Sequence, residues 1–220
     1  AVICLKKLLE EGYKIIGVVT VADKPAGRGK KLKPSEVKTF SLKNKIDLFQ
    51  PKNMKEPSFV SKIKSLTPDL IIVVAFRMIP KAIWEIPVSG SINLHASLLP
   101  NYRGAAPINW VIINNEKHTG VTTFYINDVI DSGDILLQKK VYIPKNETAG
   151  SLQEKLSIIG SELICETIAK LSKNQISSTS QKIEKKIKLA PKIDKNNSHI
   201  KLNKSLKEIE AMIRGLNPYP

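Results

Sequence analysis

Two hydrophobic periodicities divide the chain into alternating helices and strands. Apolar residues three and four positions apart, as at Val2, Leu5, Leu8 and Leu9, are typical of an amphipathic helix. Short runs rich in Val and Ile, such as KIIGVVT, are typical of buried strands. The pattern predicts helices at 2–10, 36–45, 57–66, 80–87, 106–115, 148–173 and 202–220. It predicts strands at 14–20, 46–51, 68–76, 90–96, 118–126 and 133–143.

The order of these elements indicates an α/β protein. Strands that alternate with helices favour a mostly parallel sheet. The strands at 118–126 and 133–143 follow one another directly, so we expect them to form an antiparallel extension at one edge. Residues 22–35 read as a long loop containing Gly and Pro. Residues 175–198 are rich in Lys, Ser and Asn and lack periodicity, so we expect a linker or a surface excursion there.

Composition adds a strong positive charge to this picture. The 220 residues are 42% hydrophobic and carry a formal net charge of +15. Such a charge suits a polyanionic partner, but lysines spread through Ile- and Asn-rich segments also fit a general compositional bias. No apolar run approaches the roughly 20 residues of a membrane helix. The only two cysteines, Cys4 and Cys165, lie in apolar helical contexts, so we expect buried thiols and a cytoplasmic protein.

Candidate chemistry gathers at the end of the strand predicted at 90–96. Asn93 and His95 stand two residues apart, so they share one face of that strand. Asp131 lies in a turn after the strand at 118–126 and is expected at the same end of the sheet. An amide, an imidazole and a carboxylate can support acyl transfer, with Asn93 and His95 facing an oxyanion and Asp131 orienting His95. The chain has neither a G-x-S-x-G elbow nor a metal-ligand motif, so we expect no acyl-enzyme and no metal.

Three motifs together carry a resemblance to a known family. The stretch INLHASLLPNYRGAAP, followed by GVTTFYINDVIDSGDIL, resembles the folate-dependent formyltransferases. ADKPAGRGKKLKPSEVK is similar to a long basic loop of the family members that act on methionyl-tRNA. IRGLNPYP is similar to the segment that closes their first domain.

The resemblance implies a Rossmann-like N-terminal catalytic domain of a two-domain enzyme. It places the catalytic domain at 1–174, and a linker with a closing helix at 175–220. In the family a strand and a G-T-P-type turn would precede Ala1, and a barrel-like domain of the OB type would follow Pro220. The implied enzyme is a cytoplasmic monomer of translation initiation.

The implied reaction moves the formyl group of 10-formyltetrahydrofolate to the α-amine of initiator methionyl-tRNA. By resemblance the catalytic residues are Asn93, His95 and Asp131. A folate-contacting loop would comprise Ser97, Leu98, Leu99 and Pro100. Contacts to tRNA would come from Arg28, Lys30 and Lys31.

Two alternatives stay open from the sequence. A formyltransferase of the same class could act on a small amine, such as a purine precursor or an amino-sugar nucleotide. A non-catalytic basic domain could instead bind RNA, although aromatic residues, at 5% of the chain, are scarce for a base-stacking platform.

Overall fold

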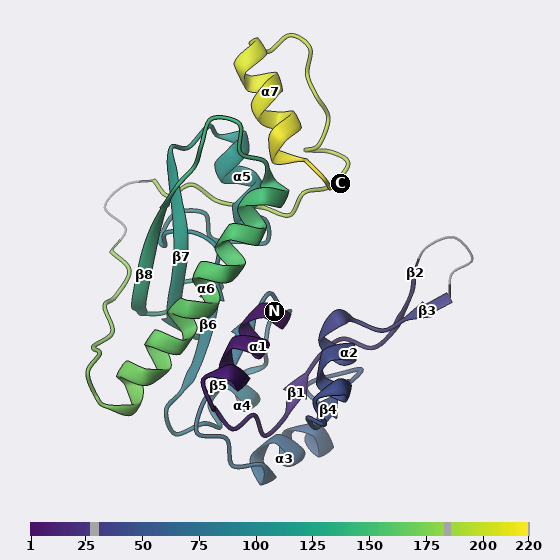
Figure 1. The fold of residues 1–220 in the computed structure, drawn as a ribbon, viewed down its shortest axis with the longest axis vertical. Helices are drawn as coiled ribbons and strands as arrows, with labels where there is room; N and C mark the ends of the chain where they lie inside the picture. The colour runs from purple at the N-terminus through teal and green to yellow at the C-terminus, as the bar shows by residue number, and fades with distance from the viewer. Residues whose placement is uncertain (27–30, 183–185, 220) are drawn as a thin grey trace. The chain divides into compact units, whose positions relative to one another are not determined.

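The computed structural model describes residues 1–26, 31–182 and 186–219. Its chain forms two compact units, Ala1–Ser91 and Ile92–Pro220 (Figure 1). The predicted α/β character is confirmed, because helices and strands alternate in the first unit and a sheet packs against a helix in the second. The domain boundary predicted at residue 174 stays a prediction.

The first unit contains short strands and helices in alternation. Its elements are α1 (Val2–Glu10), β1 (Val18–Val19), β2 (Lys24–Ala26), β3 (Lys31–Lys33), α2 (Glu36–Lys43), β4 (Leu48–Phe49), α3 (Pro57–Ser65), β5 (Ile71–Val74) and α4 (Lys81–Trp84). Strands β1 and β4 run parallel, with Val18 opposite Leu48. Buried Met54, Ile63 and Ile83 form one hydrophobic cluster of its core.

One prediction for the first unit was wrong. The segment 22–35 contains the antiparallel hairpin β2–β3 rather than a continuous loop, with Pro25 opposite Leu32. Its sequence lacks the apolar alternation that marks a half-buried strand. In agreement with this, Leu32 in β3 is 70% exposed. The sequence of this hairpin therefore carried no hydrophobic signature of a strand.

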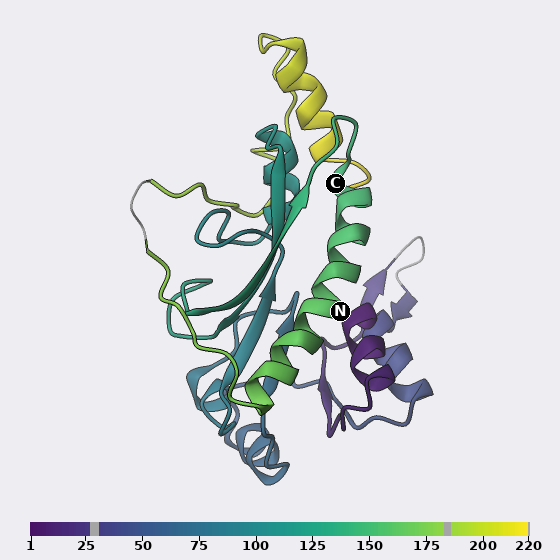
Figure 2. The ribbon, with the colours of Figure 1, turned by 60° about the vertical axis from the view of Figure 1, so that its left-hand side comes forward.

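The second unit is an antiparallel sheet with a long helix against it. Its elements are β6 (Ser91–His95), α5 (Pro107–Ile113), β7 (His118–Tyr125), β8 (Ile135–Tyr142), α6 (Ala149–Ser172) and α7 (Leu206–Gly215). Strand β7 pairs antiparallel with both β6 and β8, which confirms the predicted antiparallel extension. Figure 2 shows α6 lying along one face of β7 and β8.

Local chemistry explains where the two last helices begin and end. Thr148 and Ser151 form a reciprocal capping box that starts α6. Ser205 and Glu208 do the same for α7, so this helix begins at Leu206 and not at residue 202 as the sequence predicted. Gly215 ends α7, as expected.

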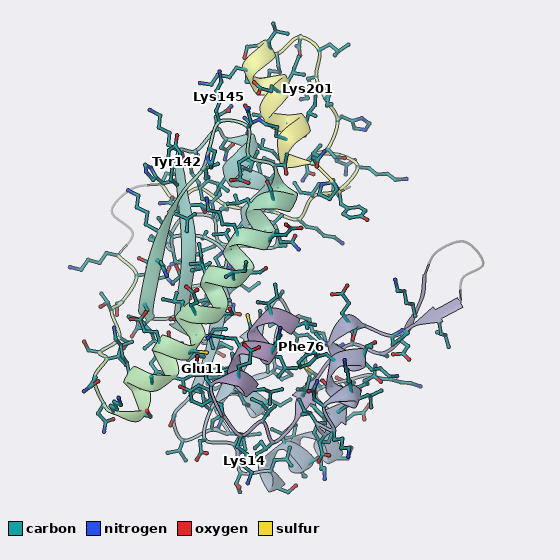
Figure 3. All side chains as sticks on the ribbon, viewed as in Figure 1. Glu11, Lys14, Phe76, Tyr142, Lys145 and Lys201 are labelled. Atoms are coloured by element: carbon teal, nitrogen blue, oxygen red, sulfur yellow. The ribbon has the colours of Figure 1, made fainter. Side chains whose placement is uncertain are left out.

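The core of the second unit lies between the sheet and its helices. The buried residues of this core are Tyr102, Val111, Ile112, Val121, Val141, Ile143, Leu152, Leu156, Leu163 and Ala190. Six consecutive residues of β7, from Thr119 to Phe124, are buried, so both faces of this strand are covered. The outer end of the β7–β8 pair is more open, and there His118 meets Tyr142 edge to face with ring centroids 5.6 Å apart (Tyr142 is labelled in Figure 3).

Candidate functional site

Strand β6 presents the first two candidate residues. In its pairing with β7, Asn93 lies opposite Phe124 and His95 opposite Thr122. The alternation of a strand puts both side chains on one face. His95 is buried and Asn93 is half-buried, and the Asn93 carboxamide has no hydrogen bond to any other described residue. The amide is therefore available to a ligand.

Two oxygens fix the imidazole of His95. Nε2 lies 2.8 Å from the main-chain oxygen of Tyr102, and because a carbonyl can only accept, Nε2 carries the proton. Nδ1 lies 3.6 Å from Oδ2 of Asp131, which is within ion-pair range but too far for a hydrogen bond. The ring is thus oriented from one side by the main chain and faces a carboxylate on the other.

Asp131 reaches His95 from the turn between β7 and β8. Its side chain is only 11% exposed, and Oδ2 accepts a hydrogen bond of 2.9 Å from the Gly104 amide. Its backbone has a φ of 51°, a left-handed conformation that Asp adopts more readily than most residues. The structure therefore brings together His95 and Asp131, which the sequence places 36 residues apart.

The glycine that holds Asp131 has no room for a side chain. Gly104 has a φ of 124°, and a Cβ at this position would lie 2.4 Å from the main-chain oxygen of Ala190. Ala190 in turn donates its amide to Arg103 O at 2.8 Å. The loop after β6 is thus packed tightly against a later segment of the chain.

Hydrogen bonds from β7 hold the predicted folate loop, Ser97 to Pro100. Ser97 and Leu99 are buried, and the Thr122 hydroxyl donates to Ser97 O at 2.6 Å while accepting from the Leu99 amide at 3.3 Å. Gln138 adds a hydrogen bond of 2.9 Å to Leu99 O. The Ser97 hydroxyl donates to Asn101 O at 2.7 Å and the Leu99 side chain is buried, whereas Leu98 and Pro100 are half-buried.

A second cluster of polar side chains supports the same loop. The Tyr102 hydroxyl and the Lys188 ammonium both donate to Oε1 of Glu116, each at 2.5 Å. Burial, followed by the bond to Glu116, raises the pKa of Tyr102 well above its usual value. Burial also raises the pKa of Glu116, but the bonds from Lys188 and Tyr102 and the charge of Lys188 outweigh it, so that pKa is lowered. Glu116 is therefore a carboxylate that holds a neutral phenol.

This cluster borders a small cavity of about 190 Å³. Its lining residues are Leu98, Asn101, Tyr102, Val111, Glu116, His118, Thr119 and Lys188. None of the described lining residues is one of the predicted catalytic residues, so the cavity lies beside the site.

The basic residues predicted to bind tRNA can be located only in part. Arg28 and Lys30 lie outside the described residues. Lys31 begins β3 of the hairpin. At the base of this hairpin Lys38 pairs with Asp23 at 2.7 Å, and the hydrogen bond from Lys38 lowers the pKa of Asp23.

The described residues offer neither a metal-ligand cluster nor a membrane-spanning helix. Within residues 1–26, 31–182 and 186–219, no group of three or more His, Cys, Asp or Glu side chains could hold a metal ion. Over the same ranges, none of the helices has the length and apolar character needed to span a membrane.

Comparison with known proteins identifies the family. A family model described as formyl transferase matches residues 2–168. The chain belongs to the formyl transferase family. The methionyl-tRNA formyltransferase of Flavobacterium psychrophilum is 50% identical over 208 residues, which are 94% of this chain and 66% of that protein. The methionyl-tRNA formyltransferase of Clostridioides difficile is 48% identical over 221 residues, which cover 100% of this chain and 71% of that protein.

Solved structures show that formyl transferases share this fold. The structure of WlaRD, a sugar 3N-formyl transferase, aligns with a TM-score of 0.71 and 24% identity, covering 97% of this chain and 74% of that one. The predicted family, enzyme class and Rossmann-like fold are therefore confirmed. The family match favours an enzyme over a non-catalytic RNA-binding domain. This formyl transferase chain spans about two thirds of the length of the curated relatives it matches.

Sequence reasoning missed several residues that hold the site. The buried Thr122 and the exposed Gln138 anchor the loop after β6, and Gln181 contacts both Arg103 and the Asp131 turn. Thr122 belongs to a predicted strand, and a polar residue within a strand expected to be buried was the only sign that its hydroxyl would have a structural role. Gln181 lies in a segment without periodicity, so its sequence offered no comparable signal.

Proposed function

We propose that this chain carries the formyl-transfer site of an enzyme that formylates methionyl-tRNA. The supporting observation is its 48–50% identity, over nearly its whole length, to methionyl-tRNA formyltransferases. Formyl transfer within this family agrees with a folate-derived donor, and WlaRD was solved in the presence of 5-N-formyl-THF. We propose 10-formyltetrahydrofolate as the donor, and a cytoplasmic monomer as the form that acts in translation initiation.

The proposed chemistry needs one bond made and one broken. The neutral α-amine of the methionyl group attacks the formyl carbon, and a tetrahedral oxyanion forms. When the intermediate collapses, the bond from the formyl carbon to the folate nitrogen breaks. The amine loses one proton and the folate nitrogen gains one, so the products are a formamide and tetrahydrofolate.

Asn93, His95 and Asp131 fit these steps. The carboxamide of Asn93 can donate to the oxyanion, because it has no hydrogen-bonding partner among the described residues. Nδ1 of His95 lies 3.6 Å from Oδ2 of Asp131, which is too far for a hydrogen bond between them, so Nδ1 stays available to a reacting group. Asp131 can accept the proton that the amine releases and pass it, through water, toward the folate nitrogen.

The folate and tRNA subsites are part of the same proposal. Leu98 and Pro100 would offer side chains to the donor, whereas Ser97 and Leu99 would contact it through their main chain. Arg28, Lys30 and Lys31 would bind the acceptor end of tRNA, where a guanidinium suits phosphates and bases.

Single-turnover formylation of methionyl-tRNA by the intact protein tests the catalytic assignment. Removing one preorganised donor typically slows a reaction by about 10²–10³-fold, so Asn93→Ala and His95→Ala should each lose that much rate. His199→Ala is the matched control, because His199 is exposed. Near-full rates in either site variant would refute the assignment. Faster formylation of an amino-sugar nucleotide or a purine precursor than of methionyl-tRNA would refute the substrate.

A further inference from the structure

The segment that follows α6 runs beside the proposed catalytic site and is pinned at two points. Thr179 and Ile135 exchange two main-chain hydrogen bonds, each of 2.8 Å. Further along, Leu189 forms a parallel bridge with Arg103. The first of these contacts lies beside the Asp131 turn and the second beside the loop after β6.

Gln181 joins these two parts of the site through its side chain. Its Oε1 accepts two hydrogen bonds from the Arg103 guanidinium, from Nη2 at 2.6 Å and from Nε at 3.2 Å. Its Nε2 donates to the main-chain oxygens of Asp131 at 3.0 Å and Gly133 at 2.7 Å. One carboxamide therefore binds a cation on one side and the catalytic turn on the other.

The chemistry of the position calls for glutamine. The guanidinium can only donate and the two carbonyls can only accept. A carboxamide matches both, because it has an oxygen and an amino group on one planar unit. A carboxylate would satisfy Arg103 but place acceptors against acceptors at Asp131 and Gly133. An apolar side chain of the same length would satisfy neither.

The turn bound by Gln181 has a backbone conformation that requires stabilising contacts. Asp131 has a φ of 51°, and non-glycine residues keep such conformations only when their surroundings fix them. Gly104 holds the Asp131 carboxylate at 2.9 Å, and Gln181 holds its main-chain oxygen. Together the two contacts set the position of Oδ2, which lies 3.6 Å from Nδ1 of His95.

We propose that Gln181 is a positioning residue of the formyl-transfer reaction, acting by tying the Asp131 turn to Arg103. This inference rests on the proposed function of Asn93, His95 and Asp131. Because a displacement of about 1 Å in a catalytic group can cost about 10²-fold in rate, loss of the tie should lower kcat. It should leave KM for both substrates nearly unchanged, since Gln181 acts through the turn and not on substrate.

The test uses the intact protein with Gln181→Ala and Gln181→Glu, and Gln175→Ala as the matched control. Gln175 is exposed and lies in the same segment, and its side chain bonds to no other described residue. Both Gln181 variants should lose about 10- to 100-fold in kcat while each KM changes by less than about threefold. The Glu variant separates the two halves of the tie, because it keeps Arg103 but cannot donate to the turn. A kcat within about twofold of wild type, or a loss that falls wholly in KM, would overturn the proposal.

Amide hydrogen exchange supplies a readout independent of activity. The Gly104 amide, which is bonded to Asp131, should exchange faster in both Gln181 variants than in wild type or Gln175→Ala. Unchanged exchange would overturn the positioning role even if the wild-type protein formylated another amine. A wild-type protein that formylates methionyl-tRNA, together with fully active Gln181 variants, would reject this inference and leave the proposed function standing.

Discussion

Replacing Thr122 by Val should strongly destabilise the second unit. Thr122 is fully buried in β7, and its hydroxyl donates to Ser97 O at 2.6 Å. The same oxygen accepts from the Leu99 amide at 3.3 Å and from Gln138 Nε2 at 2.9 Å. Valine keeps the shape of threonine but removes the hydroxyl, so these partners lose their bond without a change in volume.

The expected magnitude follows from the groups left behind. Gln138 keeps its bond to Leu99 O, but Ser97 O and the Leu99 amide lose the Thr122 bond. A buried polar group without a partner costs about 1–3 kcal/mol, so two such groups cost about 2–6 kcal/mol. The long 3.3 Å bond from Leu99 places the expectation at the lower end, at about 2–4 kcal/mol. Such a loss is a large part of the roughly 5–15 kcal/mol by which domains are stable.

Urea unfolding of the intact protein measures this loss, and the same strand provides the control. Thr119 is 3% exposed, and its Oγ1 has no hydrogen-bond partner among the described residues. Thr119→Val replaces an unpaired hydroxyl by a methyl group, so it should be neutral or stabilising. Thr122→Ser keeps the hydroxyl and should cost only about 1 kcal/mol for the lost methyl group. Equal losses in the two Val variants, or a Ser variant as unstable as Thr122→Val, would refute the explanation.

Three further outcomes are expected. The hydrogen bonds from Ser205 in the capping box of α7 lower the pKa of Glu208 from 4.5 to about 2, so Glu208 stabilises the helix fully above pH 4.5 and no longer does so once the pH falls through about 2. The amide exchange rate of α7 should rise over this pH range, and Glu208→Gln should remove this pH dependence. Gly104→Ala should cost about 10²-fold in kcat because its Cβ would meet Ala190 O, whereas Gly12→Ala, with no atom within 4 Å of its Cβ, should keep full activity; equal effects would contradict the packing argument. Arg28→Ala should raise KM for methionyl-tRNA and leave the folate KM unchanged, and the KM for methionyl-tRNA should depend on salt no more steeply than in wild type. A change in the folate KM alone would reject the tRNA role of Arg28.

Elements with a buried face were the ones the sequence could predict. Helix α6 was expected at 148–173 and spans Ala149–Ser172. The prediction succeeded because the apolar periodicity and the capping residue Thr148 can both be recognised in the sequence. Strand β6 was expected at 90–96 and spans Ser91–His95. Strand alternation by itself places Asn93 and His95 on one face.

Contacts made through the main chain could not be predicted in the same way. His95 is oriented by the carbonyl of Tyr102, and Asp131 by the amide of Gly104. Every residue has these groups, so their use leaves no mark on composition or periodicity. For the same reason the segment around Gln181 was expected to be only a linker, although it contacts the Asp131 turn.

A centre held mainly by peptide groups can keep its geometry while neighbouring side chains diverge. The carbonyl of Tyr102, which orients His95, and the amide of Gly104, which holds Asp131, belong to the backbone and would remain if side chains other than Gln181 were exchanged around them. Substitutions in the side chains that surround the site then leave the positions of His95 and Asp131 unchanged. Directed evolution toward a new acceptor should therefore begin with the side chains that surround the site, because these can change without breaking the backbone contacts that hold His95 and Asp131.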